Sequence, residues 1–440
     1  MASTNISRTL SSGAATTKFT YSVWLKYSGF VAGGQRWFSA IGTGDTYFRF
    51  NENGTMEISG YNSGATSLGY FITNRKFQDN SGWYHLVIKS DTTQSTEADR
   101  FKLYINGVQT TSFSTATYPN QNATDNINLA GNTQYIGGAA SSQYFNGVMS
   151  HVIYCDNYAY DASSFGETDS TTGEWKINTS PSVTYGTNGF YLLKDGNSVT
   201  DQSGNSNDFS YSNGTLTNTK DCPSNVFSTW NGSIGNMDTL TNGNTTITRS
   251  GSGWRSAFSS LPLPSTGKFY CEFKIASGTN ARIGICDDSF DNCIDVQNRG
   301  LAGEMGSTAN GIAYINNGNY QQNPGTYGSW GDSFTSSNVI GMAVDMTNMK
   351  LYFSKDGVYQ DSGDPTSGST GTGAFSITAT TGKYFAGVSI NASGCHVNFG
   401  NGTFGTTAVS SAGTPGSTPG EFEYDVPTGY QPLTTKGLNA

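Results

Sequence analysis

The side chains that could carry acid–base or nucleophilic chemistry are few, and their spacing does not suit catalysis. Glycoside hydrolysis needs two carboxyl groups about 5 to 10 Å apart on one face. Glu52 and Glu57 come nearest to such a pair, but Asn53 and Gly54 interrupt the strand pattern between them. The chain has no Gly-x-Ser-x-Gly turn that would present a nucleophile. We therefore predict a protein without enzymatic activity.

The three histidines give no metal or catalytic pattern. His85, His151 and His396 each fall within a strand-like run, and none has a partner at the spacing of a zinc ligand set. We expect each imidazole to pack or hydrogen-bond inside the fold.

Aromatic side chains in polar loops favour binding to sugars, because a flat ring can stack on the apolar face of a sugar. The candidates for contact with a glycan or a partner are Tyr320, Tyr327, Trp330, Trp37 and Tyr47. The first three lie in a Gly- and Asn-rich stretch, residues 314–330, and the other two belong to the first half of the chain. The alternative is that these rings close the ends of β-sandwiches or contact a neighbouring subunit.

Composition places these residues in an all-β protein. The 440 residues include 56 Gly, 25 Tyr, 25 Phe and 7 Trp, and only 12% are charged, which is typical of short strands joined by turn-rich loops. The net charge of −9 and the lack of basic clusters argue against nucleic-acid binding. Apolar runs are too short to span a bilayer, and the first ten residues lack a secretory signal pattern, so we expect no membrane insertion.

The six cysteines show no Cys-x-x-Cys pair. Most free cysteines in folded proteins are buried. We interpret these as buried reduced thiols, and a disulfide such as Cys286 with Cys293 is the alternative.

Period-two runs predict a first sandwich over residues 1–162. Phe19, Tyr21, Val23, Leu25 and Tyr27 fall on one face of the first run. The later runs are residues 83–89, 101–107, 135–138 and 147–154, and Asn106-Gly107 predicts a hairpin turn.

Similar runs predict a second sandwich over residues 232–410, with its first strong signal near Trp254. They span residues 269–275, 282–286, 338–345, 349–353, 384–390 and 395–399.

The remaining segments are a connector and a tail. Residues 163–231 are rich in turn chemistry and predict an ordered connector, with Tyr185, Phe190, Tyr191, Leu192 and Phe209 as anchors. Residues 411–440 contain a Pro-, Gly- and Ser-rich linker followed by a patterned segment, 422–438. The fold prediction is two tandem jelly-roll sandwiches joined by an ordered, turn-rich connector.

These motifs resemble known domains. FTYSVWLKY, WYHLVIK, FKLYINGV and YIGG together resemble a laminin-G-like, concanavalin A-type jelly roll. GKFYCEFKI, NVIGMAVDMTNMKLYFSKDGV and CHVNFG resemble a SPRY domain, and DVPTGYQPL resembles the exit segment that follows such domains.

The connector resembles a stretch found in virion proteins of tailed bacteriophages, where it lies between two lectin-like sandwiches. The matching motifs are SSFGETDSTTGEWKI, YGTNGFYLL, DQSGNSNDF and DCPSNVFSTWN. One position departs from that pattern, because Leu193-Lys194 stands where an acidic–aromatic pair is usual.

Laminin-G-like folds sometimes bind calcium through loop aspartates and carbonyl oxygens. The resemblance therefore implies calcium candidates, which are Asp287, Asp288 and Asp291 with Asp295 in the second half and Asp45 and Asp125 in the first. The alternative is that these are solvated turn residues, because Asp favours turns. We predict no other cofactor.

The resemblance implies a structural virion protein that is displayed on the particle surface as a fibre, tail or capsid-decoration component. Its expected partners are other virion proteins, further copies of itself and a host surface glycan. The alternative function is a carbohydrate-binding host-recognition lectin. A capsule depolymerase is less favoured, because the carboxylate pair is missing.

Overall fold

The computed structural model describes residues 3–62, 65–194, 196, 199–235, 239–288, 304–322, 325–410, 412–413 and 420–436. The chain forms two compact units, called here unit 1 (residues 1–78 and 82–216) and unit 2 (residues 79–81 and 217–440). The boundary after residue 216 falls inside the expected connector, so most of that segment belongs to unit 1.

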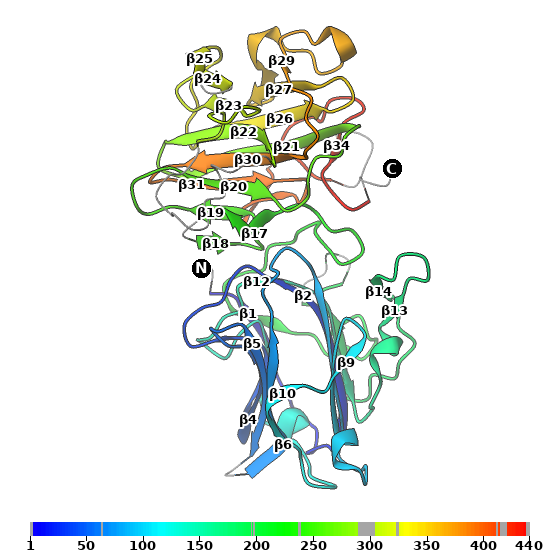
Figure 1. Cartoon of the computed structure of the whole chain (residues 1–440). Helices are drawn as coiled ribbons and strands as arrows, with labels where there is room; N and C mark the ends of the chain where they lie inside the picture. The colour runs from blue at the N-terminus through cyan, green and yellow to red at the C-terminus, as the bar shows by residue number, and fades with distance from the viewer. Residues whose placement is uncertain are drawn as a thin grey trace. The chain divides into compact units, whose positions relative to one another are not determined.

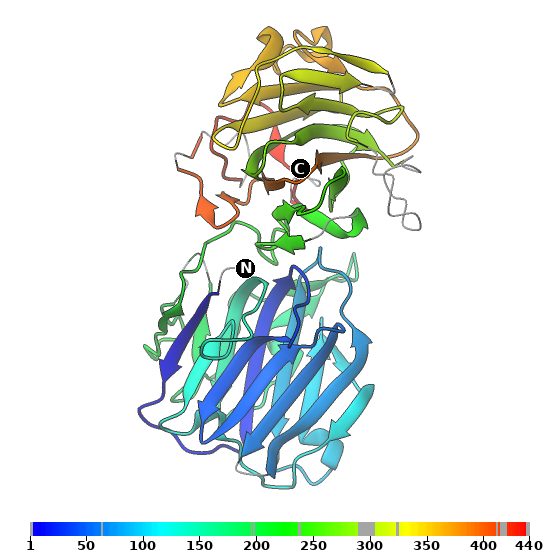
Figure 2. The same cartoon turned by 90° about the vertical axis from the view of Figure 1, so that its left-hand side faces the viewer.

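Unit 1 is a sandwich of two antiparallel sheets. The larger has the order β10 (Phe113–Thr117), β6 (Ala65–Lys76), β5 (Thr55–Asn62), β4 (Gly44–Phe50), β3 (Gln35–Gly42), β11 (Thr133–Ile136), β1 (Asn5–Thr9) and β16 (Ser210–Asn213). The smaller has the order β15 (Phe190–Leu192), β12 (Gly147–Asp156), β2 (Lys18–Tyr27), β7 (Tyr84–Asp91), β8 (Phe101–Ile105) and β9 (Val108–Thr110). Figure 1 shows the two sheets as separate layers, and Figure 2 shows strands of the larger sheet lying side by side.

The predicted inward faces of unit 1 are confirmed. All five period-two residues of β2, from Phe19 to Tyr27, are buried in the core between the sheets. The turn between β8 and β9 has φ of 48° at Asn106 and 78° at Gly107, the left-handed conformation that an Asn-Gly hairpin requires.

The expected connector builds part of unit 1. Phe190 and Leu192 lie in β15, which extends the smaller sheet and contributes to the core with Phe209. Residues 157–186, called here the strap, cover the outer face of that sheet and include the hairpin of β13 (Gly166–Thr168) and β14 (Trp175–Ile177). Figure 1 shows this hairpin outside the layer that contains β9.

Unit 2 is a second sandwich. One sheet has the order β17 (Trp230–Gly235), β20 (Arg255–Ser259), β30 (Tyr384–Ile390), β22 (Ala281–Asp287), β23 (Ile312–Ile315), β24 (Asn319–Gln322) and β25 (Thr326–Ser329). The other has the order β18 (Thr239–Thr241), β19 (Thr246–Thr248), β31 (Gly394–Asn398), β21 (Lys268–Ser277), β26 (Val339–Asp345), β27 (Lys350–Lys355) and β28 (Val358–Tyr359). In this second sheet β29 (Phe375–Ser376) also pairs with β27, and β34 (Gln431–Pro432) pairs in parallel with β21. Strands β17 to β19 precede Trp254, near which this sandwich was expected to begin.

The C-terminal segment is part of unit 2. Phe422, Val426 and Tyr430 are buried against Tyr270 and Tyr352 on the outer face of the nine-stranded sheet. Beneath them the wholly buried carboxylate of Glu272 accepts hydrogen bonds from the backbone N–H groups of residues 423 and 424, each at 2.9 Å. Hydrogen bonds to the buried Glu272 side chain therefore hold the tail against the central strand β21.

The described chain is all-β, which confirms the predicted fold class. Its helical segments are single 3₁₀ turns, η1 (Glu97–Asp99), η2 (Asn126–Asn128), η3 (Ala162–Ser164), η4 (Gln360–Ser362) and η5 (Gly368–Thr370). The remaining two-stranded sheet pairs β32 (Thr403–Phe404) with β33 (Thr407–Ala408). In the part of the chain that the structure describes, no helix has the length and apolar character needed to cross a membrane.

The described cysteines are free thiols, and Cys155, Cys271, Cys286 and Cys395 are buried. Burial raises the pKa of both the Cys155 and the Cys395 thiol to about 12, so these groups are protonated and unreactive at neutral pH. Cys293, the alternative partner of Cys286, lies outside the described residues.

Candidate functional site

The predicted contact residue Trp37 is a core residue. Its side chain has 0% exposure, and its ring packs against Tyr21 and Phe48 at centroid distances of 5.6 and 5.1 Å. This placement corrects the sequence expectation for Trp37, because a ring enclosed between two sheets cannot stack on a surface ligand. Its position on β3 faces the core, which the loop-like composition around it did not reveal.

Tyr47 is half-buried, and polar neighbours already occupy its ring and its hydroxyl. The Arg36 guanidinium lies 4.1 Å from the ring centroid, the Arg49 guanidinium lies 5.2 Å from it, and the hydroxyl donates to Glu57 at 2.7 Å. Burial, followed by the hydrogen bond to the Glu57 carboxylate, raises the pKa of Tyr47 to about 12. Tyr47 is therefore part of a cluster with the charged side chains of Arg36, Arg49 and Glu57.

Tyr320 and Trp330 face inward at one end of the unit 2 sandwich. Both rings pack on Phe375, with centroid distances of 5.2 Å for Tyr320 and 4.8 Å for Trp330. Gly328 lies opposite Tyr320 in the register of β24 and β25 and leaves room for its ring. These two residues adopt the sandwich-closing role that was the alternative.

Tyr327 points the other way. It pairs with Gln321 in the next register position, so strand alternation places it on the outer face, where it is 52% exposed. Hydrogen bonds from Asn319 and Asn317 lower its pKa, and they hold the phenol oxygen in place.

Arg282 organises the surface around Tyr327. Its guanidinium lies 4.6 Å from the centre of the Trp254 ring, bonds to the Glu304 carboxylate at 2.6 Å and donates to the Gln321 side chain. Burial is the main cause that lowers the Arg282 pKa, while Glu304 opposes that shift. Trp254, Arg282, Glu304, Gln321 and Tyr327 are called here the Tyr327 patch.

The sequence interpretation missed four members of this patch. Arg282 could have been found, because it alternates with Ile283 and Ile285 in β22 and must therefore face outward. Trp254, Glu304 and Gln321 gave no local signal, since only strand register brings them together. The patch offers aromatic rings, a guanidinium, a carboxylate and an amide, which are groups that can stack on and hydrogen-bond to a hydroxyl-rich ligand.

The calcium candidates are dispersed. Asp287 is buried and accepts a hydrogen bond from the Asn310 amide at 2.7 Å, whereas Asp288 is exposed. Asp291 and Asp295 lie outside the described residues. In unit 1, Asp45 accepts two bonds from Arg36, and Asp125 accepts from Thr46. Among the residues that the structure describes, no three His, Cys, Asp or Glu side chains are grouped as a metal site.

His85 forms a Ser–His hydrogen bond like that of a catalytic pair, but here the histidine is the donor and the serine is the acceptor. The Nε2 atom of His85 lies 2.9 Å from Oγ of Ser22, and Nδ1 accepts a hydrogen bond from the Trp175 indole at 2.9 Å. An indole N–H can only donate, so Nδ1 carries no proton and Nε2–H must donate to the serine. Burial lowers the pKa of His85 to about 3, which fixes the neutral form. In this state the imidazole cannot accept the proton of Ser22.

The other two histidines also make internal contacts. His151 lies 2.6 Å from the Ser150 hydroxyl, and His396 lies 2.8 Å from the Thr246 hydroxyl. Burial lowers the pKa of His396 to about 4. Both imidazoles are therefore engaged in contacts within the fold.

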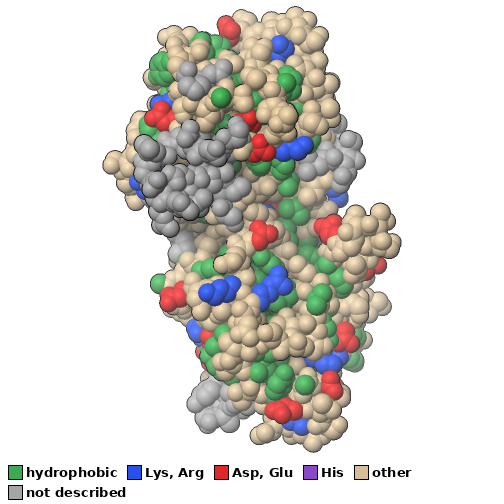
Figure 3. All heavy atoms as spheres, in the orientation of Figure 1, with side chains coloured by type: hydrophobic (Ala, Val, Ile, Leu, Met, Phe, Trp, Pro, Cys, Tyr) green, Lys and Arg blue, Asp and Glu red, His purple; other side chains and the backbone are tan. Residues whose placement is uncertain are grey.

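The charged surface is mixed in sign. The chain has 23 Lys and Arg against 32 Asp and Glu residues. Figure 3 shows both kinds interspersed on the face in view. Such a face favours uncharged or mixed partners over a polyanion.

Comparisons with known proteins identify two domain types. Residues 3–157 match the family model described as the concanavalin A-like lectin/glucanases superfamily, of the Laminin_G_3 type, and residues 268–402 match that of the SPRY domain. No curated protein matches the chain.

Similar solved structures include two human SPRY domains and a pentraxin. A human SPRY domain is 14% identical, with 36% of this chain and 92% of that chain covered and a TM-score of 0.27. The SPRY domain of human HERC1 is 13% identical over 38% and 96% of the two chains, with a TM-score of 0.29. A heptameric SAP-like pentraxin from Limulus polyphemus is 16% identical over 36% and 71%, with a TM-score of 0.26. The two family models alone show that the chain carries a concanavalin A-like domain and a SPRY domain in tandem.

Proposed function

We propose that this protein is a non-enzymatic structural component of a tailed-bacteriophage particle, displayed on its surface. The resemblance of residues 163–231 to the connector of such virion proteins is the observation that carries the proposal. The structure gives these motifs an architectural role, because the first forms the strap hairpin and the second supplies β15. Its partners in this role are other virion proteins and further copies of the same chain.

The location of the protein in purified particles tests this proposal. Immunogold labelling or cryo-electron microscopy should find it on intact particles, on the tail, a fibre or the capsid. Recovery of the protein only in the free fraction of a lysate would contradict a virion role. Density on the capsid would assign decoration, and density at the tail would assign receptor contact.

A second role, recognition of a host surface glycan, is favoured by the Tyr327 patch. Tyr327 is 52% exposed, and the side chains around it are those that bind sugar hydroxyl groups, the Arg282 guanidinium and the Gln321 amide. Replacement of Tyr327 by Ala should weaken adsorption of the particles to their host, and Tyr327→Phe should retain most of it. Unchanged adsorption of the Ala variant would remove the patch from host recognition.

The absence of catalysis is part of the proposal. His85 donates to Ser22 instead of activating it, and Glu57 is bonded to Arg49 and Tyr47. Incubation of the protein with host capsule or cell-wall polysaccharide should therefore release no reducing sugar. Sugar release that is lost on replacing one acidic residue would establish a depolymerase instead.

A further inference from the structure

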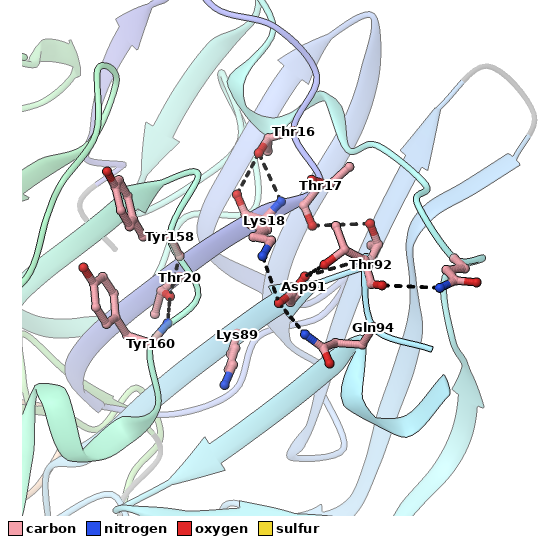
Figure 4. Close-up of polar contacts among 12 residues, drawn as sticks. Thr16, Thr17, Lys18, Thr20, Lys89, Asp91, Thr92, Gln94, Tyr158 and Tyr160 are labelled. Carbon is pink, nitrogen blue, oxygen red and sulfur yellow. Dashed lines mark hydrogen bonds and ion pairs between the residues drawn. The ribbon is translucent and has the colours of Figure 1, made fainter. Parts of the chain in front are cut away.

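Unit 1 presents a pair of parallel tyrosine rings at the start of the strap. The ring centroids of Tyr158 and Tyr160 are 6.0 Å apart, and the ring planes differ by 13°. Tyr158 is 41% exposed, although tyrosine rings in this unit are mostly buried or half-buried. Figure 4 shows the two side chains side by side.

The backbone under these rings is fixed by one hydroxyl group. Thr20 of β2 donates to the carbonyl oxygen of Tyr158 at 2.9 Å and accepts from the backbone N–H of Tyr160 at 2.7 Å. The hydroxyl of Tyr160 accepts a further bond from the backbone N–H of Thr184 at 3.0 Å. The pair is therefore held in place before any ligand arrives, which reduces the entropy cost of binding.

Charged side chains next to the pair are balanced in sign. Lys89 is the cross-strand neighbour of Thr20 and bonds to Asp161 at 2.9 Å. Lys18, on the same face of β2, bonds to Asp91 at 3.3 Å, as Figure 4 shows. The side chains of Lys18 and Asp161 are 39% and 53% exposed, so each still has surface open to solvent. The site therefore offers one exposed cationic donor and one exposed anionic acceptor, without net charge.

We propose that Tyr158 and Tyr160 form a binding platform for an uncharged sugar ring of a glycan. A sugar ring has an apolar C–H face that suits an aromatic surface, and its hydroxyl groups both accept and donate hydrogen bonds. The Lys18 ammonium can donate to a sugar hydroxyl, and the Asp161 carboxylate can accept from one. The charge balance disfavours charged ligands. A polyanion would be repelled by Asp91 and Asp161, and a polycation would be repelled by Lys18 and Lys89. The site lies on unit 1 and is distinct from the Tyr327 patch, and the inference extends the proposed recognition role.

A glycan array followed by calorimetry with the full chain tests the platform. Tyr158→Ala removes the exposed ring and should lower the affinity for the bound glycan about tenfold, whereas Tyr158→Phe should retain it within about twofold. Tyr211→Ala is the matched control, because Tyr211 is an exposed tyrosine of the same unit, with 45% exposure. This control should leave the affinity unchanged.

The same titrations in a Tyr327→Ala background separate the two sites. Binding that survives Tyr327→Ala and is lost on adding Tyr158→Ala supports the platform. Binding that depends on Tyr327 alone, or an array on which no glycan is bound, overturns it without affecting the virion proposal. Unchanged glycan affinity of Tyr158→Ala combined with a loss of particle incorporation would also overturn it, and would assign the tyrosine pair to a protein partner.

Discussion

The indole N–H of Trp175 donates to Nδ1 of His85 at 2.9 Å and thereby joins the strap to the smaller sheet of unit 1. The imidazole also lies close to two indole rings that are nearly parallel to it, with centroid distances of 4.7 Å to Trp24 and 5.9 Å to Trp175. His85 is wholly buried beneath this cover. Histidine often takes part in catalysis, but His85 here links the strap to the sheet beneath it.

Removing the indole donor should destabilise unit 1. Trp175→Phe retains an aromatic ring but leaves the buried Nδ1 atom of His85 without a donor, which costs about 1 to 3 kcal/mol. Differential scanning calorimetry should show a lower unfolding temperature for unit 1 and an unchanged unfolding temperature for unit 2. Lys176→Ala, which removes an exposed ion pair with Asp169 in the same hairpin, is the control and should have little effect. Equal effects of the two variants would argue against a specific role of the indole.

The turn glycine beneath Trp175 should be intolerant of a side chain. A Cβ atom at Gly107 would lie 2.4 Å from the Trp175 ring, on a backbone with φ of 78°. Gly131 has φ of 87° but no atom within 4 Å of the corresponding position, so Gly131→Ala reports the backbone strain alone, about 1 to 2 kcal/mol. We expect Gly107→Ala to lower the free energy of unfolding clearly more than Gly131→Ala. Similar losses in chemical denaturation would show that Trp175 moves aside freely.

The stability of unit 2 should fall as the pH rises through the titration of Glu272. Burial raises the pKa of this carboxyl from 4.5 to about 7, although hydrogen bonds from the backbone of residues 423 and 424 oppose the shift. The folded state therefore binds the proton more tightly than the unfolded chain does. The stabilisation is fully present below pH 4.5 and is lost by about pH 7, at about 1.4 kcal/mol for each pKa unit.

Urea unfolding of unit 2 at several pH values measures this dependence. Glu272→Gln cannot titrate and should remove the decline between these pH values. A wild-type stability that rises with pH over the same range would contradict the raised pKa.

Truncation to alanine should cost much more stability at Trp37 than at Tyr327. Trp37 is enclosed in the unit 1 core, so Trp37→Ala should cost about 3 to 5 kcal/mol of unfolding free energy. Tyr327→Ala removes an exposed ring and should change stability by about 0.5 kcal/mol or less. Denaturant unfolding with binding assays would separate the structural ring from the surface ring. A small effect of Trp37→Ala would mean that the core collapses around the lost indole.

Local patterns predicted strands where apolar residues alternate clearly, but they missed β3 to β6 of the larger unit 1 sheet, which are seven to twelve residues long. Alternating apolar residues in β2, β7 and β8 identified the inward faces, because side chains in a strand point alternately to its two sides. The short strands β17 to β19 and β32 to β34 were missed, since runs of two to six residues carry too little periodicity. The strap was predicted only as a connector because its turn chemistry is local, whereas its contacts with Val87 of β7 and Tyr104 of β8 join residues far apart in sequence.

The sequence by itself determined the all-β class, the two tandem domains and the faces of strands such as β2, β7 and β8, since these follow from composition and a period of two. Only the tertiary structure decided which aromatic rings are available to a ligand. Tyr327 and Tyr320 lie in the same short stretch, yet register turns one outward and the other onto Phe375. Exposure depends on what packs above a side chain, and segments far along the chain supply that cover.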